Sequence, residues 1–406
     1  MGTAFERERE LDDAFVMHTF SRKPVQFVRG QGVRLYDDDG KEYLDFLAGI
    51  GVVSVGHCNP TVSSAIVEQA QKLVHVGNYF YIEHRGKLAE RICTMLAGDT
   101  GEKFQVFFAN SGAEANEGAI KLARLWGKRH RDGAQGIITA KSSFHGRTLA
   151  TLAATGQEGL QAPFAPLPPG FAHVPLNDID ALAAALDTPI DGTLPAAVML
   201  ECIQGESGVW PCTREYLQAV RELTAERDML LVVDEVQTGF ARTGEYFAYQ
   251  LYGVKPDIVS MAKGIADGIP MGAFAARAEV AELMQPGMHG STFGGSNIAC
   301  AAADATTALM CEPGFLEHVR AVGERLRAGL SALDFVSEVR GAGLMVGITL
   351  ADEVAPALVD VALGHGFVLN APAAGIIRFL PPLTIGDQEV DALLAALPQM
   401  YEEACK

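Results

Sequence analysis

The chain has 406 residues with a formal net charge of -18, and 49% of its residues are hydrophobic. This length exceeds that of most single cores, so two domains are expected, and the acidic balance argues against nucleic acid and anionic membranes as partners because both are bound through basic surfaces. No apolar run is long enough to span a membrane, and seven scattered cysteines without CxxC spacing predict reduced, mostly buried thiols and a cytoplasmic location.

The first 55 residues are predicted to form an extended arm with one hairpin. Two segments with strand-like alternation, Val33–Tyr36 and Glu42–Phe46, flank a turn over Asp37–Gly40. We expect this arm, residues 1–55, to pack with a small C-terminal domain.

Residues 56–313 alternate apolar strands with helical patterns, which predicts a large α/β domain around a mostly parallel sheet. The expected strands are Gln105–Ala109, Gly136–Ala140, Ala197–Glu201, Leu230–Val233, Ile258–Met261 and Ala273–Ala276. Residues 314–406 are predicted to form a small α+β domain. Its expected elements are a helix over Phe315–Leu333 and strands at Val336–Val339, Gly347–Leu350, Phe367–Leu369 and Ile376–Leu380.

A turn of small residues between a strand and a helix is the first candidate site. Asn110 to Asn116 follows a predicted strand and opens a helix that extends to about Trp126. The unpaired N–H groups and the dipole of a helix N-terminus favour a bound phosphate. The alternative is a plain helix cap at Ser111 or Asn110.

Asp234 and Lys263 form the most informative pair. Each stands at the carboxyl end of a predicted buried strand, which is where ligands bind in open α/β sheets. A lysine and an acid placed there suit pyridoxal phosphate (PLP): the amine bonds the cofactor aldehyde and the acid keeps the pyridine nitrogen protonated. Taken alone, Asp234 could be a helix cap or a hydrogen-bonded acid of the core, and Lys263 could extend to solvent.

Two further segments follow predicted strands. Phe144 could stack on a flat cofactor ring and Arg147 could bind a carboxylate, or this segment is a turn with a core Phe and a solvated Arg. Between Glu201 and Glu206, one carboxylate could be structural and the other could face a substrate, or both are solvated. His57-Cys58 lacks a second ligand pair at zinc spacing, so no metal site is expected.

Eight short motifs occur in a fixed order between about Pro24 and Pro382. They are Gly56-His57, Asn110 to Asn116, Phe144 to Thr148, Gln204 to Glu206, Asp234 to Gly239, Ala262 to Gly264, His289 to Gly295 and Arg378 to Leu383. Their order resembles the class III aminotransferases of PLP fold type I. That resemblance implies a large α/β domain with a mostly parallel, seven-stranded sheet and a small α+β domain. The subgroup most similar at Gly49 to Val52, Ser142 to Thr148 and Leu369 to Ala371 is the N-acetylornithine aminotransferases.

The resemblance implies PLP as cofactor and a role for each matching residue. Lys263 would form the Schiff base and shuttle the proton, Asp234 would pair with the pyridinium nitrogen, and Gln237 would hydrogen-bond the ring 3-oxygen. The remaining contacts to the cofactor would come from Phe144 stacked on the ring, from His145, from Ser111, Gly112 and Ala113 at the phosphate, and from Thr292 of the neighbouring subunit in a homodimer.

For the substrates, the resemblance implies that Arg378 binds the α-carboxylate of glutamate and that Arg147 binds the far carboxylate. Glu206 would pair with Arg378 when a donor brings only an amine end, because a buried unpaired cation is costly. Tyr79 and Ser291 are the other expected substrate contacts. The implied ping-pong reaction moves the δ-amine of N2-acetylornithine to 2-oxoglutarate, giving N-acetylglutamate 5-semialdehyde and glutamate for arginine biosynthesis.

Three positions depart from the usual family pattern: Cys202, Asp267 and Ser296. None of the three removes a chemical group that the implied mechanism uses. They leave open the geometry of the loops near the phosphate and the subunit interface. Within the enzyme class, a related ω-aminotransferase for succinylornithine, ornithine, 4-aminobutyrate or a lysine-pathway donor is the alternative. An aminomutase or decarboxylase relative would keep the cofactor and change the product. A non-catalytic binding protein of the same fold would typically lack the lysine or the acid, and both are present here.

Overall fold

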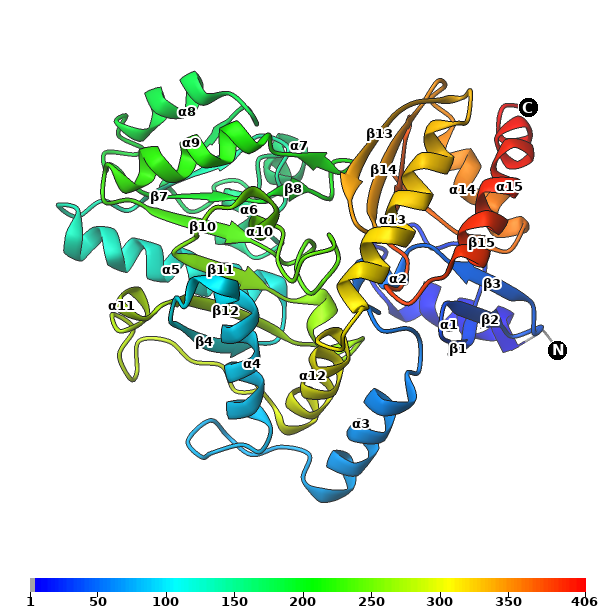
Figure 1. Ribbon diagram of the computed structural model, residues 1–406, viewed down its shortest axis with the longest axis horizontal. Helices are drawn as coiled ribbons and strands as arrows, with labels where there is room; N and C mark the ends of the chain where they lie inside the picture. Colours follow the sequence, from blue (N-terminus) through cyan, green and yellow to red (C-terminus); the bar gives the residue numbers. More distant parts are fainter. Residues whose placement is uncertain (1–3) are drawn as a thin grey trace.

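The largest sheet forms the centre of the computed structural model, which describes residues 4–406 (Figure 1). Seven strands lie in the order β4-β12-β11-β10-β7-β5-β6. In that order their bounds are Phe104–Ala109, Gly272–Arg277, Ile258–Met261, Leu230–Asp234, Pro195–Leu200, Gly136–Ala140 and Phe171–Val174. Only β12 is antiparallel to its neighbours in this sheet, so the expected mostly parallel α/β arrangement is confirmed.

Helices cover both faces of this sheet. Along β10, Leu230 and Val232 share an apolar cluster with residues of α5 (Gly112–His130), whereas Leu231 and Val233 share another with residues of α9 (Arg214–Ala225). Successive side chains of a strand point to opposite faces. A strand enclosed by two helix layers must therefore be apolar at every position, as this run is.

The other helices of this region surround the sheet. α12 packs against both α3 and α4, and α4 also packs on β4, in the lower part of Figure 1. Their bounds are Pro60–Lys72, Arg85–Ala97 and Asn297–Met310; the remaining helices here are α6 (Leu149–Ala154), α7 (Glu158–Gln161), α8 (Ile179–Leu186), α10 (Tyr249–Tyr252) and α11 (Ala278–Ala281).

The C-terminal part forms an antiparallel sheet in the order β13-β14-β17-β16, with helices packed against it. The strands span Val336–Ala342, Met345–Leu350, Ile376–Phe379 and Asn370–Ala373, and the helices are α13 (Phe315–Ser331), α14 (Ala355–Gly364) and α15 (Asp387–Ala404). The predicted helix and strands of this part are all present. β16 was not expected.

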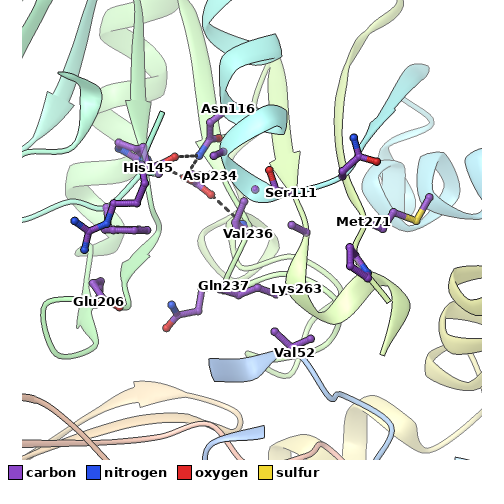
Figure 2. Close-up of a pocket in the computed structure, with 18 of the residues that line it drawn as sticks. Val52, Ser111, Asn116, His145, Glu206, Asp234, Val236, Gln237, Lys263 and Met271 are labelled. Carbon is purple, nitrogen blue, oxygen red and sulfur yellow. Dashed lines mark hydrogen bonds and ion pairs between the residues drawn. The ribbon is translucent and has the colours of Figure 1, made fainter. Parts of the chain in front are cut away.

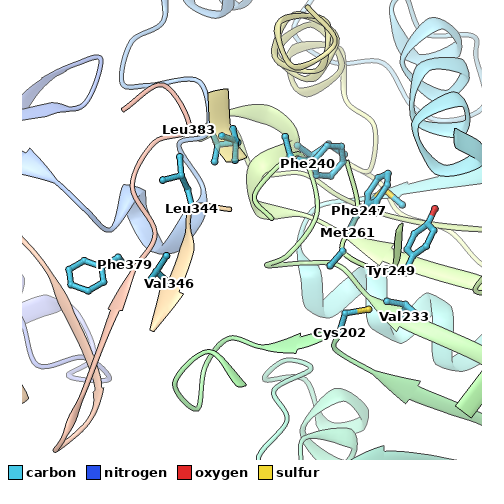
Figure 3. Packing of buried hydrophobic residues seen from close by; sticks show 14 of the residues in the cluster. Cys202, Val233, Phe240, Phe247, Tyr249, Met261, Leu344, Val346, Phe379 and Leu383 are labelled. Carbon is cyan, nitrogen blue, oxygen red and sulfur yellow. The ribbon is translucent and has the colours of Figure 1, made fainter. Parts of the chain in front are cut away.

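The predicted N-terminal hairpin is also present, and it pairs with a distant segment. β1 (Phe27–Gln31), β2 (Arg34–Asp37) and β3 (Glu42–Asp45) form an antiparallel series, and β15 (Phe367–Val368) adds to β3 in parallel. One apolar cluster extends from the large sheet into the C-terminal part. Figure 3 shows Val233 and Phe240 on one side and Val346 and Phe379 on the other.

Two expectations were wrong. The arm expected to be extended contains a helix, α1 (Ala4–Phe15), because its Glu, Arg, Leu and Ala residues favour helix and Arg9 lies 5.7 Å from the ring of Phe5, one turn away. The cysteines are not mostly buried: the exposed ones are Cys58, Cys311 and Cys405, and Cys93 is half-buried. Cys311 and Cys405 directly follow helix ends, where the chain meets solvent.

Candidate active site

A cavity of about 460 Å³ opens at the carboxyl ends of the large sheet's strands (Figure 2). Asp234 ends β10, Lys263 follows β11, and the segment that begins α5 follows β4. Three elements far apart in sequence thus bring their polar ends to one place, as open α/β sheets do. The predicted site residues that line the cavity are Ser111, Gly112, Ala113, Phe144, His145, Arg147, Glu206, Asp234, Gln237 and Lys263.

Asp234 is buried and held by three hydrogen bonds. Its Oδ2 accepts from Asn116 Nδ2 at 2.7 Å and lies 2.8 Å from His145 Nδ1, while its Oδ1 accepts from the Val236 N–H at 2.9 Å. Figure 2 shows Asn116 and His145 converging on this carboxylate. Burial disfavours protonation of His145, but the hydrogen bond and the charge of Asp234 outweigh burial and raise the pKa of the imidazole. The carboxylate of Asp234 is therefore fixed in a set orientation.

The N-terminus of α5 forms another wall of the cavity. Ser111 caps the helix, its Oγ accepting from the Glu114 N–H at 3.2 Å. A Cβ at Gly112 would lie 2.7 Å from Val236 Cγ1, so only glycine lets the helix start this close to the end of β10. The first N–H groups of a helix have no partner within it, so this wall presents donors that can face an anion.

Lys263 extends into the same cavity from a strained backbone position. Its φ is +44°, a left-handed conformation that L-residues rarely adopt. Burial, together with the nearby positive charge of Arg378, lowers the pKa of the amine to about 8. Near neutral pH a substantial fraction of this amine is therefore neutral and nucleophilic, whereas an ordinary lysine is almost fully protonated.

Arg378 lies on β17, behind the cavity wall, and only 2% of it is exposed. Its guanidinium donates to Asn370 Oδ1 at 2.8 and 3.0 Å, to the Gly205 carbonyl at 2.9 Å and to Gln237 Oε1 at 3.3 Å. Its Nη1 also forms an ion pair with Glu206 Oε2 at 3.2 Å. Burial lowers the pKa of Arg378, and Glu206 opposes that shift.

Glu206 lies in the loop between two short strands, β8 (Ile203–Gln204) and β9 (Trp210–Pro211), and its side chain is 40% exposed. Its carboxylate is therefore free to move in a way that the buried guanidinium is not. On another wall, Arg147 is exposed and lies 5.4 Å from the centre of the Phe144 ring. One arginine, Arg378, is thus enclosed behind the cavity wall, and another, Arg147, is accessible on the wall itself.

Four predicted site residues do not line this cavity: Arg378, which lies behind its wall, and Tyr79, Thr292 and Ser291. Tyr79 is 98% exposed, and Thr292 is also exposed. Ser291 is half-buried beside the start of α5, where its Oγ accepts from Asn110 Nδ2 at 3.0 Å. Their assigned roles stay predictions.

Sequence reasoning gave no role to Asn116, and it left open whether Glu201 or Glu206 is the structural carboxylate. Asn116 stands four residues after Gly112, so on a helix it faces the same way, and this spacing was the available signal. Glu201 is buried, and its carboxylate accepts from the N–H groups of Phe144 at 2.9 Å and Gly205 at 3.2 Å. Burial raises the pKa of Glu201 to about 7. It holds together the loops that carry Phe144 and Glu206.

Within residues 4–406, no cluster of three or more His, Cys, Asp or Glu side chains could hold a metal ion. The same residues include no helix with the length and apolar character needed to cross a membrane.

The family model described as aminotransferase class-III matches residues 17–400, and the chain belongs to this family. It is therefore an aminotransferase with the PLP-transferase fold that its sequence motifs implied.

Curated relatives cover almost the whole chain. An acetylornithine aminotransferase from Caldanaerobacter subterraneus is 46% identical over 96% of this chain and 98% of its own length, and one from Streptomyces coelicolor is 45% identical over 96% and 94%. Among solved structures, the ornithine aminotransferase of Toxoplasma gondii has a TM-score of 0.91 at 31% identity, covering 99% of this chain and 97% of that one. The acetylornithine aminotransferase of Elizabethkingia anophelis has a TM-score of 0.85 at 32% identity, covering 99% and 100%.

Proposed function

We propose that this chain is an N-acetylornithine aminotransferase. It transfers the δ-amine of N2-acetylornithine to 2-oxoglutarate, giving N-acetylglutamate 5-semialdehyde and glutamate, a step of arginine biosynthesis in the cytoplasm. The observation that carries the proposal is the cavity shared by Asp234 and Lys263, with Arg378 paired to Glu206 at its edge. The names of relatives at 42–46% identity support acetylornithine as the donor.

The residues present fit PLP as the cofactor. The α5 N-terminus suits the phosphate, and the fixed carboxylate of Asp234 suits a pyridinium nitrogen. Two buried polar atoms beside it, Asn116 Oδ1 and His145 Nε2, have no hydrogen-bond partner. In this proposal Gln237 donates to the ring oxygen and Phe144 stacks on the ring. When bound, PLP supplies an electron sink that makes a proton on the donor carbon acidic.

Lys263 is the residue placed to move that proton. Its lowered pKa leaves the amine partly neutral near neutral pH, so it can accept a proton from the donor carbon and return it elsewhere. The same property makes it the nucleophile that bonds the cofactor. Asp234 is assigned instead to the pyridinium nitrogen, because its two oxygens accept three hydrogen bonds and about one acceptor position remains.

Glu206 explains how one site takes two unlike donors. Acetylornithine presents an amine end without a carboxylate, and the Glu206 ion pair then neutralises the buried Arg378. Glutamate brings its own α-carboxylate, and the half-exposed Glu206 moves aside so that Arg378 binds it. Arg147, at the accessible wall, binds the side-chain carboxylate of glutamate or the α-carboxylate of acetylornithine.

The active form in this proposal is a homodimer. The loop with Tyr79, Phe80 and Tyr81 and the neighbouring Phe293 expose large aromatic side chains together, and such patches mark interfaces. Asn78 holds the two segments side by side, donating to the carbonyls of Ser291 at 2.7 Å and Gly294 at 3.1 Å. From such an interface, Thr292, Tyr79 and Ser291 would complete the partner's site.

The test is a set of half-reactions. PLP-loaded protein is mixed singly with N-acetylornithine, succinylornithine, ornithine, 4-aminobutyrate or glutamate, and loss of the absorbance of the lysine-bound cofactor is followed. Fast loss with N-acetylornithine and glutamate, and slow loss with the others, is the expected result. Preference for ornithine, the donor named for the Toxoplasma neighbour, would replace the proposed donor. A Lys263→Ala variant that retains full turnover would contradict the catalytic assignment.

A further inference from the structure

The segment that precedes the cavity wall at Val52 has an unusual backbone. Ala48, Gly49, Ile50 and Gly51 all have positive φ angles, 50°, 63°, 69° and 73°. Such a left-handed turn is unfavourable for alanine and more so for the β-branched isoleucine. Strained backbone of this kind persists only where its surroundings hold it in place.

A buried carboxylate holds the start of this turn. Asp45, 1% exposed, accepts through Oδ1 from the N–H groups of Leu47 and Ala48, both at 2.8 Å. Its Oδ2 lies 2.7 Å from His57 Nε2. The hydrogen bonds of Asp45 thus fix the backbone where the left-handed turn begins.

A second carboxylate, that of Asp267, holds the other end. Its Oδ1 accepts from the Val55 N–H at 2.9 Å. Asp267 directly follows the short helix Lys263–Ala266, and its own φ is +47°. The two segments also touch: a Cβ at Gly264 would lie 2.6 Å from Ser54 Oγ. Asp267 therefore connects the lysine loop to the segment that brings Val52 into the cavity.

We propose that Asp267 is a positioning residue for the amino donor. Its carboxylate fixes the wall at Val52 relative to Lys263, and so sets the space in which the donor's amine meets the lysine. This inference rests on the proposed function.

The surroundings of Asp267 affect its protonation, but they leave its hydrogen bond to Val55 possible in either protonation state. Burial raises its pKa to about 6, and the N–H groups of Val55 and Ser54 and the charge of His57 oppose that rise. The titratable groups near this region include Asp45, which faces His57, and Arg242, on which the charge of Asp45 acts. The acceptor oxygen is available whether Asp267 is ionised or neutral, so an amide can replace the carboxylate.

The test compares two substitutions that both tolerate a positive φ. Asp267→Gly removes the acceptor, and Asp267→Asn keeps it. The matched control is Asp132→Gly, because Asp132 has a φ of 48° and is exposed on the surface. Hydrogen exchange of residues 48–55 is measured by mass spectrometry on the full-length, PLP-loaded proteins. Asp267→Gly is expected to speed this exchange about tenfold, and the other two variants to match the parent.

Steady-state kinetics on the same proteins then separates positioning from general stability. Asp267→Gly is expected to raise KM for the amino donor about fivefold or more with a smaller change in kcat, and Asp267→Asn to restore it. Unchanged exchange in Asp267→Gly, or faster exchange with unchanged KM, would overturn the inference. Failure of the proposed function itself would be seen differently, as no amine turnover by the parent protein.

Discussion

The ion pair between Glu206 and Arg378 makes a prediction about substrate discrimination. In Glu206→Ala the buried guanidinium of Arg378 has no counter-ion while N-acetylornithine is bound. The half-reaction with N-acetylornithine should therefore slow about tenfold. The glutamate half-reaction should be as fast or faster, because no carboxylate then competes for Arg378. Single-turnover absorbance with each donor measures both rates. Glu206→Gln is the matched control and should fall between. Equal slowing of both half-reactions would contradict the proposal that Arg378 pairs in turn with Glu206 and with the α-carboxylate of glutamate.

The lowered pKa of Lys263 predicts how cofactor capture depends on pH. Only the neutral amine bonds the aldehyde, and its fraction rises with pH through about 8. The rate of PLP capture by cofactor-free protein should therefore increase about tenfold between pH 7 and pH 9 and then level off. Stopped-flow absorbance measures this rate, with Lys263→Ala as the blank. A rate that keeps rising steeply above pH 10 would mean that the amine has its ordinary pKa.

Some residues of the site were predictable from the sequence because strand ends determine where they lie. Asp234 and Lys263 end apolar runs, and parallel strands bring such ends to one edge. The pairing of Glu201 with two backbone N–H groups was not predictable, because it depends on how separate loops fold back. The contact between Asp267 and Val55 was not predictable for the same reason.

At the scale of elements, the packing of α5 on the sheet gives a stability prediction. A Cβ at Gly118 would lie 2.2 Å from Phe274 Cε1 on β12, so Gly118→Ala should lower the free energy of unfolding by about 1–3 kcal/mol. Gly364→Ala, at the exposed end of α14 with open space around it, is the control. It should be neutral or stabilising by up to about 1 kcal/mol. Urea unfolding followed by fluorescence measures both, and an unaffected Gly118→Ala would show that the helix can shift.

Strands buried on both faces were the elements that the sequence predicted best, since their residues are apolar at every position. β6 was missed because Phe171–Val174 is short, lies at the sheet edge and includes His173. The reversed direction of β12 was not predicted, because strand direction depends on the path of the connecting chain. α1 was missed because its residues are polar and exposed, and only helix propensity distinguishes it.

At the scale of the whole molecule, the exposed aromatic loop predicts association. Phe293→Asp should shift the protein from dimer to monomer and lower turnover in parallel, because a charge at this position must be desolvated in an interface. Sedimentation velocity measures the association state. Ile179→Asp, at the exposed start of α8 on the opposite side of Figure 1, is the control and should leave the dimer intact. A Phe293→Asp protein that remains a fully active dimer would exclude this surface.

The pairing of β3 with β15 has a consequence for how the chain matures. Leu44 of β3 is paired with Phe367 of β15. The hairpin that contains β3 is made early in synthesis, but β15 can pair with it only after nearly the whole polypeptide has left the ribosome. All strands of the seven-stranded sheet lie between these two points and can pair first. Throughout that interval the edge of β3 presents unpaired N–H and C=O groups. Protection of this edge by a chaperone, or fast translation of the final third, would therefore increase the share of newly made protein that escapes aggregation.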